Sequence, residues 1–133
     1  MLAIKPIEDK AVQEHFVTLC GGTYMESDFA YLANECEADG KTVRFPIGVC
    51  QFSLKGDLGE FHDLRSCPGV EDEEGMMIMA RAAMSFLFRC GIPTLTAADG
   101  CADPALLKKL GFVADEDGKL TFDLQKFYTS HHH

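Results

Sequence analysis

Residues 59–91 constrain the fold of this chain most strongly, because they predict a strand, a short loop and a long buried helix in direct succession. The first part alternates like extended chain, in which every second side chain points to the same face. That pattern predicts one face with Glu60, His62, Leu64 and Ser66. Residues 76–88 are almost all apolar, which predicts a helix surrounded by protein, and Gly91 ends that helix as a C-terminal cap.

The loop before this helix carries four acidic residues, Glu71, Asp72, Glu73 and Glu74. A loop that leads into a helix N-terminus exposes backbone N–H groups and the positive end of the helix dipole, so it commonly binds phosphate. The negative carboxylates of this loop would repel a phosphate. Three interpretations stay open: the acids stabilise the first helical turn, they share a divalent cation with a phosphate, or they form a surface for a basic partner.

The composition fits a single domain. The chain has 133 residues, 47% of them hydrophobic, which is enough for one core. We assign residues 1–130 to that domain and interpret residues 131–133, three histidines, as the remnant of a purification tag. The net charge of −9 disfavours nucleic acid and anionic membranes and favours a cationic partner such as an amine. Without a membrane-length apolar run or a signal peptide, we expect a cytoplasmic location.

The cysteines do not predict a metal centre. The chain has six of them, with no Cys-x-x-Cys pair and no histidine nearby, so neither a zinc site nor a redox dithiol is indicated. Small buried thiols in a reducing compartment are the simpler interpretation. We therefore assign no metal ligands.

The rest of the chain predicts a mixture of strands and helices. Strands are expected at 2–7, 30–37, 41–54, 93–98, 112–114 and 119–124, and helices at 8–19 and 105–110. Residues 25–29 fit either a short helix or a loop. The helix at 8–19 should bury Val12, His15, Phe16 and Leu19. The strand at 93–98 follows a strand and a helix, so a right-handed crossover should place it parallel to the strand at 59–67.

This order of elements resembles the GNAT family of acyl-CoA-dependent N-acetyltransferases over nearly the whole chain. Pro68 and Gly91 have the separation usual in that family, and the segment DPALLKKLGF, which ends at Phe112, matches a second family motif in register. The resemblance implies an α/β (α+β) fold with a mixed, mostly antiparallel sheet and flanking helices. The strands at 59–67 and 93–98 would form its parallel pair.

The departures from the family pattern fall where the family binds its cofactor and protonates its product. In the phosphate loop, the Arg or Gln position and the glycine positions hold Glu71, Asp72, Glu74 and Met76. Gly75 is the one glycine left, and it is out of register by one residue. Gly100 stands at the family's Asn, and Leu107 stands at the Tyr that commonly protonates the departing thiolate.

The resemblance also implies an activity and a site. The family transfers an acetyl group from acetyl-CoA to an amine of a small molecule or peptide. Glu60 matches a catalytic Glu of some members, and His62 lies two residues on, so either could be the base; a solvated strand-end carboxylate and a packed histidine are the alternatives. The residues that would bind the cofactor are Leu64, Ser66, Asp72, Glu73, Glu74, Gly75 and Met76.

Two functions remain open on the sequence. Each carboxylate near a phosphate costs about 1 kcal/mol in a watery setting, so the acidic loop would weaken acetyl-CoA binding by about 2–4 kcal/mol without forbidding it. The first function is therefore an N-acetyltransferase. The alternative is a catalytically inactive GNAT-like binding or regulatory module that does not bind coenzyme A and could pair as a homodimer. The two functions can be distinguished by whether the two parallel strands part to leave an open cleft or are bridged by side chains.

Overall fold

The computed structural model describes residues 1–130, and the interpretation of residues 131–133 as a tag remnant lies outside that part of the chain. The described strands form one seven-stranded sheet in the order β1-β2-β3-β4-β5-β7-β6. Along the chain the elements are β1 (Leu2–Pro6), α1 (Lys10–Leu19), β2 (Phe29–Cys36), β3 (Val43–Lys55), β4 (Leu58–Ser66), α2 (Glu73–Arg89), β5 (Thr94–Ala97), α3 (Pro104–Leu110), β6 (Val113–Ala114), β7 (Leu120–Asp123) and α4 (Leu124–Ser130).

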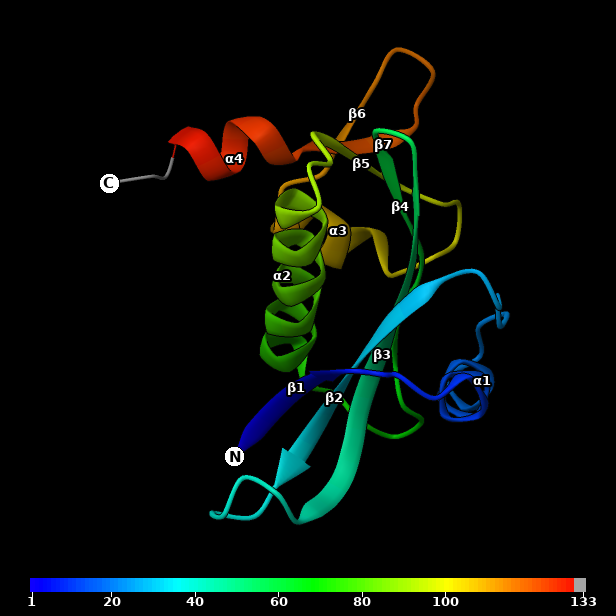
Figure 1. The fold of residues 1–133 in the computed structure, drawn as a ribbon, viewed down its shortest axis with the longest axis vertical. Coiled ribbons are helices and arrows are strands. Elements are labelled where there is room, and N and C mark those ends of the chain that lie inside the picture. Colours follow the sequence, from blue (N-terminus) through cyan, green and yellow to red (C-terminus); the bar gives the residue numbers. More distant parts are fainter. Residues whose placement is uncertain (131–133) are drawn as a thin grey trace.

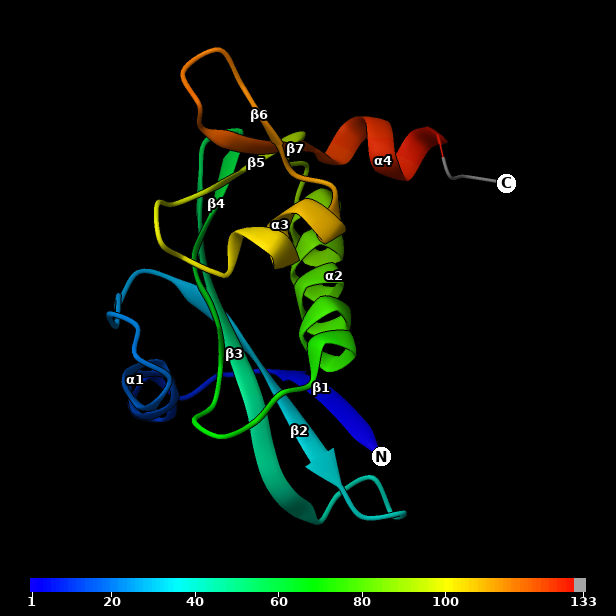
Figure 2. The same ribbon diagram turned by 180° about the vertical axis from the view of Figure 1, so that it is seen from behind.

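Neighbouring strands are antiparallel except β4 and β5, which are parallel. They run in the same direction because α2 carries the chain back along the sheet between them (Figure 1). This arrangement confirms the predicted fold class, a mixed and mostly antiparallel sheet with flanking helices and one parallel pair. Helices α2, α3 and α4 lie on one face of the sheet and α1 lies on the other (Figures 1 and 2).

The main core lies between the sheet and α2. Asp72 caps the N-terminus of α2 through a hydrogen bond that its carboxylate accepts from the Gly75 N–H. After the helix, Gly91 adopts a φ of 84°, which glycine tolerates without strain, and so turns the chain toward β5. The largest side chains sealed in this core are Phe52, Phe61, Met79, Met84, Leu87 and Leu95.

Helix α1 buries a different side from the one predicted. Asp9 caps its N-terminus as an acid near a helix start should. Its buried residues are Gln13 and Val17, whereas His15 is exposed and the predicted packing of His15 is wrong. The apolar spacing misled because Gln13 is polar yet lies inside, where its carboxamide finds hydrogen-bond partners. Residues 25–28 form a turn and not a helix.

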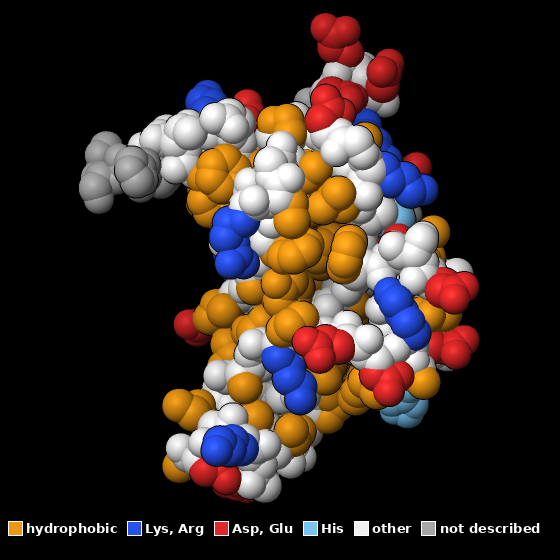
Figure 3. Space-filling view, viewed as in Figure 1, with side chains coloured by type: hydrophobic (Ala, Val, Ile, Leu, Met, Phe, Trp, Pro, Cys, Tyr) orange, Lys and Arg blue, Asp and Glu red, His pale blue; other side chains and the backbone are white. Residues whose placement is uncertain are grey.

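Hydrophobic side chains gather on the face of the molecule that carries α2 (Figure 3). Outside the core, several large apolar residues remain substantially exposed, among them Phe29, Val43, Phe45 and Ile78. None of the helices in the described part is long and apolar enough to cross a membrane. The six cysteines are free thiols, and four of them are buried.

Candidate functional site

Strand β4 contains a β-bulge at His62. On the neighbouring strand β3, Gln51 pairs with Asp63 and the next residue, Phe52, pairs with Phe61, so His62 is an extra residue with no partner of its own. A bulge re-aims the side chains that follow it. The bulge therefore decides which side chains of β4 meet on the α1 face.

The predicted faces of this strand need correction after the bulge. Glu60 and His62 share a face, since their side chains are hydrogen-bonded. Leu64, which was expected beside them, is instead buried in the core with α2. Asp63 takes its place on the α1 face and bonds to Gln51. The period-2 rule failed here because one inserted residue shifts the phase of every residue after it.

Glu60, His62 and Asp28 form a connected chain of side chains on this face. His62 Nε2 lies 3.0 Å from Glu60 Oε1, and His62 Nδ1 contacts Asp28 Oδ2, so each ring nitrogen faces a carboxylate. The exposed fraction of the side chain falls from 29% for Glu60 through 14% for His62 to 1% for Asp28. Glu60 is therefore the member that a ligand can reach.

The other oxygen of Glu60 also has partners. Lys119 Nζ donates to Glu60 Oε2 at 2.9 Å, and Thr96 Oγ1 donates to the same oxygen at 3.2 Å. Burial alone would raise the pKa of Glu60, but the hydrogen bonds from Lys119 and His62 outweigh burial and lower it. The hydrogen bond to Glu60 also raises the pKa of Lys119. Glu60 is thus held as an anion.

Asp28 has the opposite environment. Burial raises the pKa of its carboxyl group, and the contact with His62 offsets this only in part. Its Oδ1 is sealed from solvent and has no hydrogen-bond partner among residues 1–130. Asp28 therefore keeps its proton to a higher pH than an exposed aspartate does.

A second set of hydrogen bonds holds the turn that carries Asp28. Gln51 is fully buried and accepts from Gln13 Nε2 at 3.0 Å and from the Met25 N–H at 2.9 Å. Its own amide group donates to Thr23 O at 2.8 Å and to Asp63 Oδ2 at 3.0 Å. A side chain with four partners fixes the neighbouring turn in one place, and so it fixes Asp28 against His62.

The gap between β4 and β5 is bridged. The two strands pair from Leu58 with Thr94 to Phe61 with Ala97, and beyond that point the loop at 98–103 returns to β4. The Leu64 N–H donates to Cys101 O at 2.8 Å. The Arg65 guanidinium donates to Gly100 O at 2.8 Å. Of the predicted cofactor-binding residues on β4, Leu64 therefore has its N–H already bonded, whereas the Ser66 side chain is exposed.

The acidic residues before α2 have different partners. The Asp72 carboxylate accepts from the Gly75 N–H at 2.8 Å, which is the geometry of the first interpretation, in which an acid takes the place of a phosphate. Glu73 forms an exposed ion pair with Lys109 at 2.7 Å. Glu74 is exposed, and Met76 is buried in the core.

Two further positions bear on cofactor chemistry. A cavity of about 490 Å³ lies beside the loop and is lined by Phe45, Gly69, Val70, Glu71 and Asp72. Leu107, at the position of the family's tyrosine, is buried in the core and has no proton to give. Within the described residues, no group of three or more His, Cys, Asp and Glu side chains could hold a metal ion.

Two residues of this site, Asp28 and Lys119, were not predicted from the sequence. Asp28 lies in the stretch that fitted either a helix or a loop, and Lys119 follows a turn near the C-terminus. Lys119 meets Glu60 and Asp28 meets His62 only when the sheet is complete. The sheet places β7, which follows Lys119, beside β5, and it places β2, which follows Asp28, near β4. An acid at a strand start and a lysine at a strand start are too common to signal a site.

Comparison with known proteins identifies the architecture. No protein-family model and no curated protein sequence matches the chain. Solved structures do match: the ribosomal-protein-S18-alanine N-acetyltransferase from Escherichia coli has a TM-score of 0.63 at 14% identity, over 91% of this chain and 89% of that one. An IAA acetyltransferase from Bacillus cereus has a TM-score of 0.66 at 16% identity, over 87% and 79%.

A third match is the NatC complex bound to Gag peptide and CoA, with a TM-score of 0.66 at 14% identity over 92% of this chain and 98% of that one. Sequence identities this low establish the fold and not the activity. The strand order, the parallel β4–β5 pair and these similarities together show that the chain has the fold of the GNAT acetyltransferases.

Proposed function

We propose that this protein is an acetyl-CoA-dependent N-acetyltransferase that acts on a cationic amine of a small molecule or peptide. The observation that carries the proposal is Glu60, a partly exposed carboxylate held as an anion beside the point where β4 and β5 part. Acetyl transfer to an amine needs a group that anchors the ammonium ion and accepts its proton. The charge of −9 also favours a cationic acceptor.

The residues of the chain have separate roles in this proposal. Glu60 contacts the acceptor, because an ammonium ion can take the position that Lys119 Nζ holds at Glu60 Oε2. His62 and Asp28 are positioning residues, because His62 holds the other oxygen of Glu60, Asp28 holds His62, and both are mostly buried. Acetyl-CoA supplies the activated acyl group when it is bound.

The residues present fit this cosubstrate only weakly. Release of the Leu64 N–H from Cys101 and of Arg65 from Gly100 costs about 1–3 kcal/mol for the two hydrogen bonds. Repulsion from the acidic loop adds about 2–4 kcal/mol. Together these terms lower the affinity by about two to five decades relative to an open, uncharged groove. We therefore expect weak binding of acetyl-CoA, to a groove that opens when the loop at 98–103 moves.

The test is an acetylation assay with polyamines and with peptides that carry a free N-terminus, the two acceptor classes named for the spermidine and ribosomal-protein acetyltransferases of this fold. Glu60→Gln should lower kcat/KM by about 100-fold, because it removes the proton acceptor while keeping the shape. Glu116→Gln, an exposed carboxylate of the β6–β7 loop, is the matched control and should have no effect. An unchanged rate in Glu60→Gln would refute the assignment of Glu60.

A second candidate function is a binding or regulatory module that does not bind coenzyme A. The bridged gap favours it, because Cys101 occupies the Leu64 N–H and Asp72 occupies the Gly75 N–H. Calorimetry with millimolar acetyl-CoA, with and without magnesium, separates the two functions. The double variant Glu71→Gln/Glu74→Gln should bind acetyl-CoA more tightly if the enzyme proposal holds. If acetyl-CoA gives no heat of binding with the natural chain or with the double variant, the second function is the one supported.

A further inference from the structure

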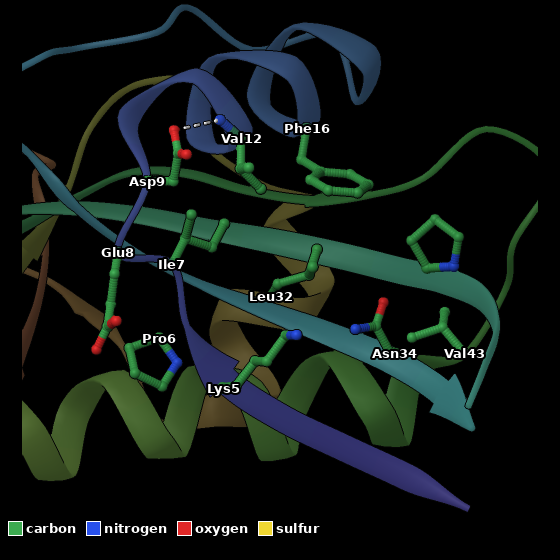
Figure 4. Close-up of a pocket in the computed structure, with 11 residues that line it drawn as sticks. Lys5, Pro6, Ile7, Glu8, Asp9, Val12, Phe16, Leu32, Asn34 and Val43 are labelled. Atoms are coloured by element: carbon green, nitrogen blue, oxygen red, sulfur yellow. Dashed lines mark hydrogen bonds between the residues drawn. The ribbon is translucent and has the colours of Figure 1, made fainter. Parts of the chain in front are cut away.

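A groove separates α1 from the sheet over β1, β2 and β3 (Figure 4). Its volume is about 630 Å³, within the range of about 300–1,000 Å³ that small-molecule sites occupy. It has no lining residue in common with the chain formed by Glu60, His62 and Asp28. Most of its walls are apolar and consist of Ile7, Val12, Phe16, Leu32, Val43 and Pro46.

One wall of the groove carries a carboxamide that has no partner in the protein and is open to the groove. Asn34 is only 4% exposed and lines the groove, yet its side chain makes no hydrogen bond with any residue in 1–130. Its neighbour across the sheet is Pro46, which has no N–H to offer. Buried amide groups are normally hydrogen-bonded. The Asn34 carboxamide is therefore free to bind something in the groove.

A free ammonium group lies on the same face. Lys5 pairs with Leu32 on the adjacent strand, two residues from Asn34, and its side chain extends toward Asn34 in Figure 4. Within residues 1–130, Lys5 forms neither a hydrogen bond nor an ion pair. Lys5 and Asn34 thus offer two kinds of N–H donor at one end of an apolar groove.

Two acidic residues, Glu8 and Asp9, also line the groove. The Asp9 carboxylate already accepts from backbone N–H groups in the first turn of α1, at 2.8 Å in the shorter case. Glu8 and Asp9 lie at the end of the groove opposite Asn34 in Figure 4. At the end of the groove near Asn34, the charged group is therefore the Lys5 ammonium group.

We propose that this groove binds a carboxylic acid with an apolar body. The carboxylate accepts hydrogen bonds from Lys5 Nζ and Asn34 Nδ2, and the hydrocarbon part lies against Leu32 and Phe16. An amine of the same length would bring a second positive charge to Lys5. An alcohol would satisfy Asn34 but leave the Lys5 charge without a partner. A carboxylate satisfies both groups at once.

Octanoate is the probe, and octylamine and octan-1-ol are its matched controls. Calorimetry with the full chain should show saturable binding of octanoate, with octylamine and octan-1-ol weaker. Lys5→Met and Asn34→Leu should each raise the Kd for octanoate about tenfold, the effect of losing one charged hydrogen bond. Lys41→Met, a change at an exposed lysine in the β2–β3 turn, should leave the Kd unchanged.

Each remaining outcome decides the proposal. Two results would overturn the proposal. Octylamine could bind as tightly as octanoate, or octanoate could bind Lys5→Met as tightly as it binds the natural chain. If Asn34→Leu does not fold, Lys5→Glu is the deciding variant. Lys5 is exposed, so this change should leave the core intact, and it should abolish octanoate binding. Glu60→Gln should leave octanoate binding intact, so a failure of the acetyltransferase proposal is separable from a failure here.

Discussion

The two faces of the sheet at β3 and β4 bury side chains equally well but with opposite chemistry. On the α2 face, Phe52 and Phe61 are fully buried among other apolar side chains. On the α1 face of the same strands, Gln51 and Asp63 are also buried, and both have hydrogen-bond partners. Packing on the α2 face requires only apolar side chains of the right volume. Burial on the α1 face also requires that each polar side chain finds its hydrogen-bond partner.

This difference shows how one sheet can separate stability from positioning. Apolar burial on the α2 face is non-directional and supplies most of the stabilising free energy. The hydrogen bonds of Gln51 are directional, and they hold the Met25 N–H and Thr23 O at fixed positions. Because that turn presents Asp28 to His62, the polar face sets the geometry of the candidate site.

The largest expected effect comes from a cavity on the α2 face. Phe61→Ala should lower the free energy of unfolding by about 3–5 kcal/mol, because a fully buried ring is replaced by a methyl group. Urea denaturation followed by circular dichroism measures the loss. Phe29→Ala removes a ring that is nearly half exposed and should cost much less. Equal losses in the two variants would contradict the assignment of the main core.

A smaller effect is expected from the polar face. Gln51→Leu has nearly the same volume but leaves the Met25 N–H and Thr23 O without partners, so it should destabilise the protein by about 1–3 kcal/mol. Faster amide hydrogen exchange at Met25 should accompany the loss. Ser53→Ala, a buried change on the same strand and face, is the control and should be nearly neutral. If Gln51→Leu matched that control, the network would have no positioning role.

The smallest expected effect is a change in the pH dependence of stability. The pKa of Asp28 is raised in the folded state, so the folded protein binds this proton more tightly than the unfolded chain. The stability that Asp28 contributes is therefore present at low pH and is lost as the pH rises from its unfolded pKa, near 3.8, through its folded pKa. The pKa of Glu60 is lowered, so its contribution is lost in the opposite direction, as the pH falls below about 4.5.

Asp28→Asn isolates the first of these contributions. The stability difference between the natural chain and the variant should shrink as the pH rises from 4 upward, measured by urea denaturation at each pH. Glu60→Gln should give a difference that grows as the pH rises toward about 4.5 and then stays level. A difference for Asp28→Asn that also grows with pH would contradict a raised pKa for Asp28.

Local pattern was enough to predict the architecture. The long apolar helix after a strand, with glycine at its end, predicted the crossover that makes β4 and β5 parallel, and the structure confirms it. The pattern could not predict the bulge at His62, because an inserted residue leaves no mark in the composition of the strand. Helix α4 was also missed, because it follows β7 directly and lacks the Asp-Pro start that marked the equally short α3.

The candidate site was predictable only in part. Glu60 and His62 were proposed from one strand, where sequence distance and spatial distance agree. Asp28 and Lys119 lie 34 and 59 residues from their partners, and only the completed sheet brings them there. The occupation of the Leu64 N–H by Cys101 depends on the path of a loop, which no periodicity describes.

The strand order has a consequence for how copies of this protein behave at high concentration. The sheet ends at β1 on one side and at β6 on the other, so neither rim offers a long row of free backbone groups. β1 is five residues long and carries Lys5 and Pro6, and β6 has only two residues. Short rims with a charge and a proline resist the edge-to-edge strand addition that starts amyloid-like fibres. Association through the exposed apolar side chains of this chain would therefore use side-chain contacts and not an extension of the sheet.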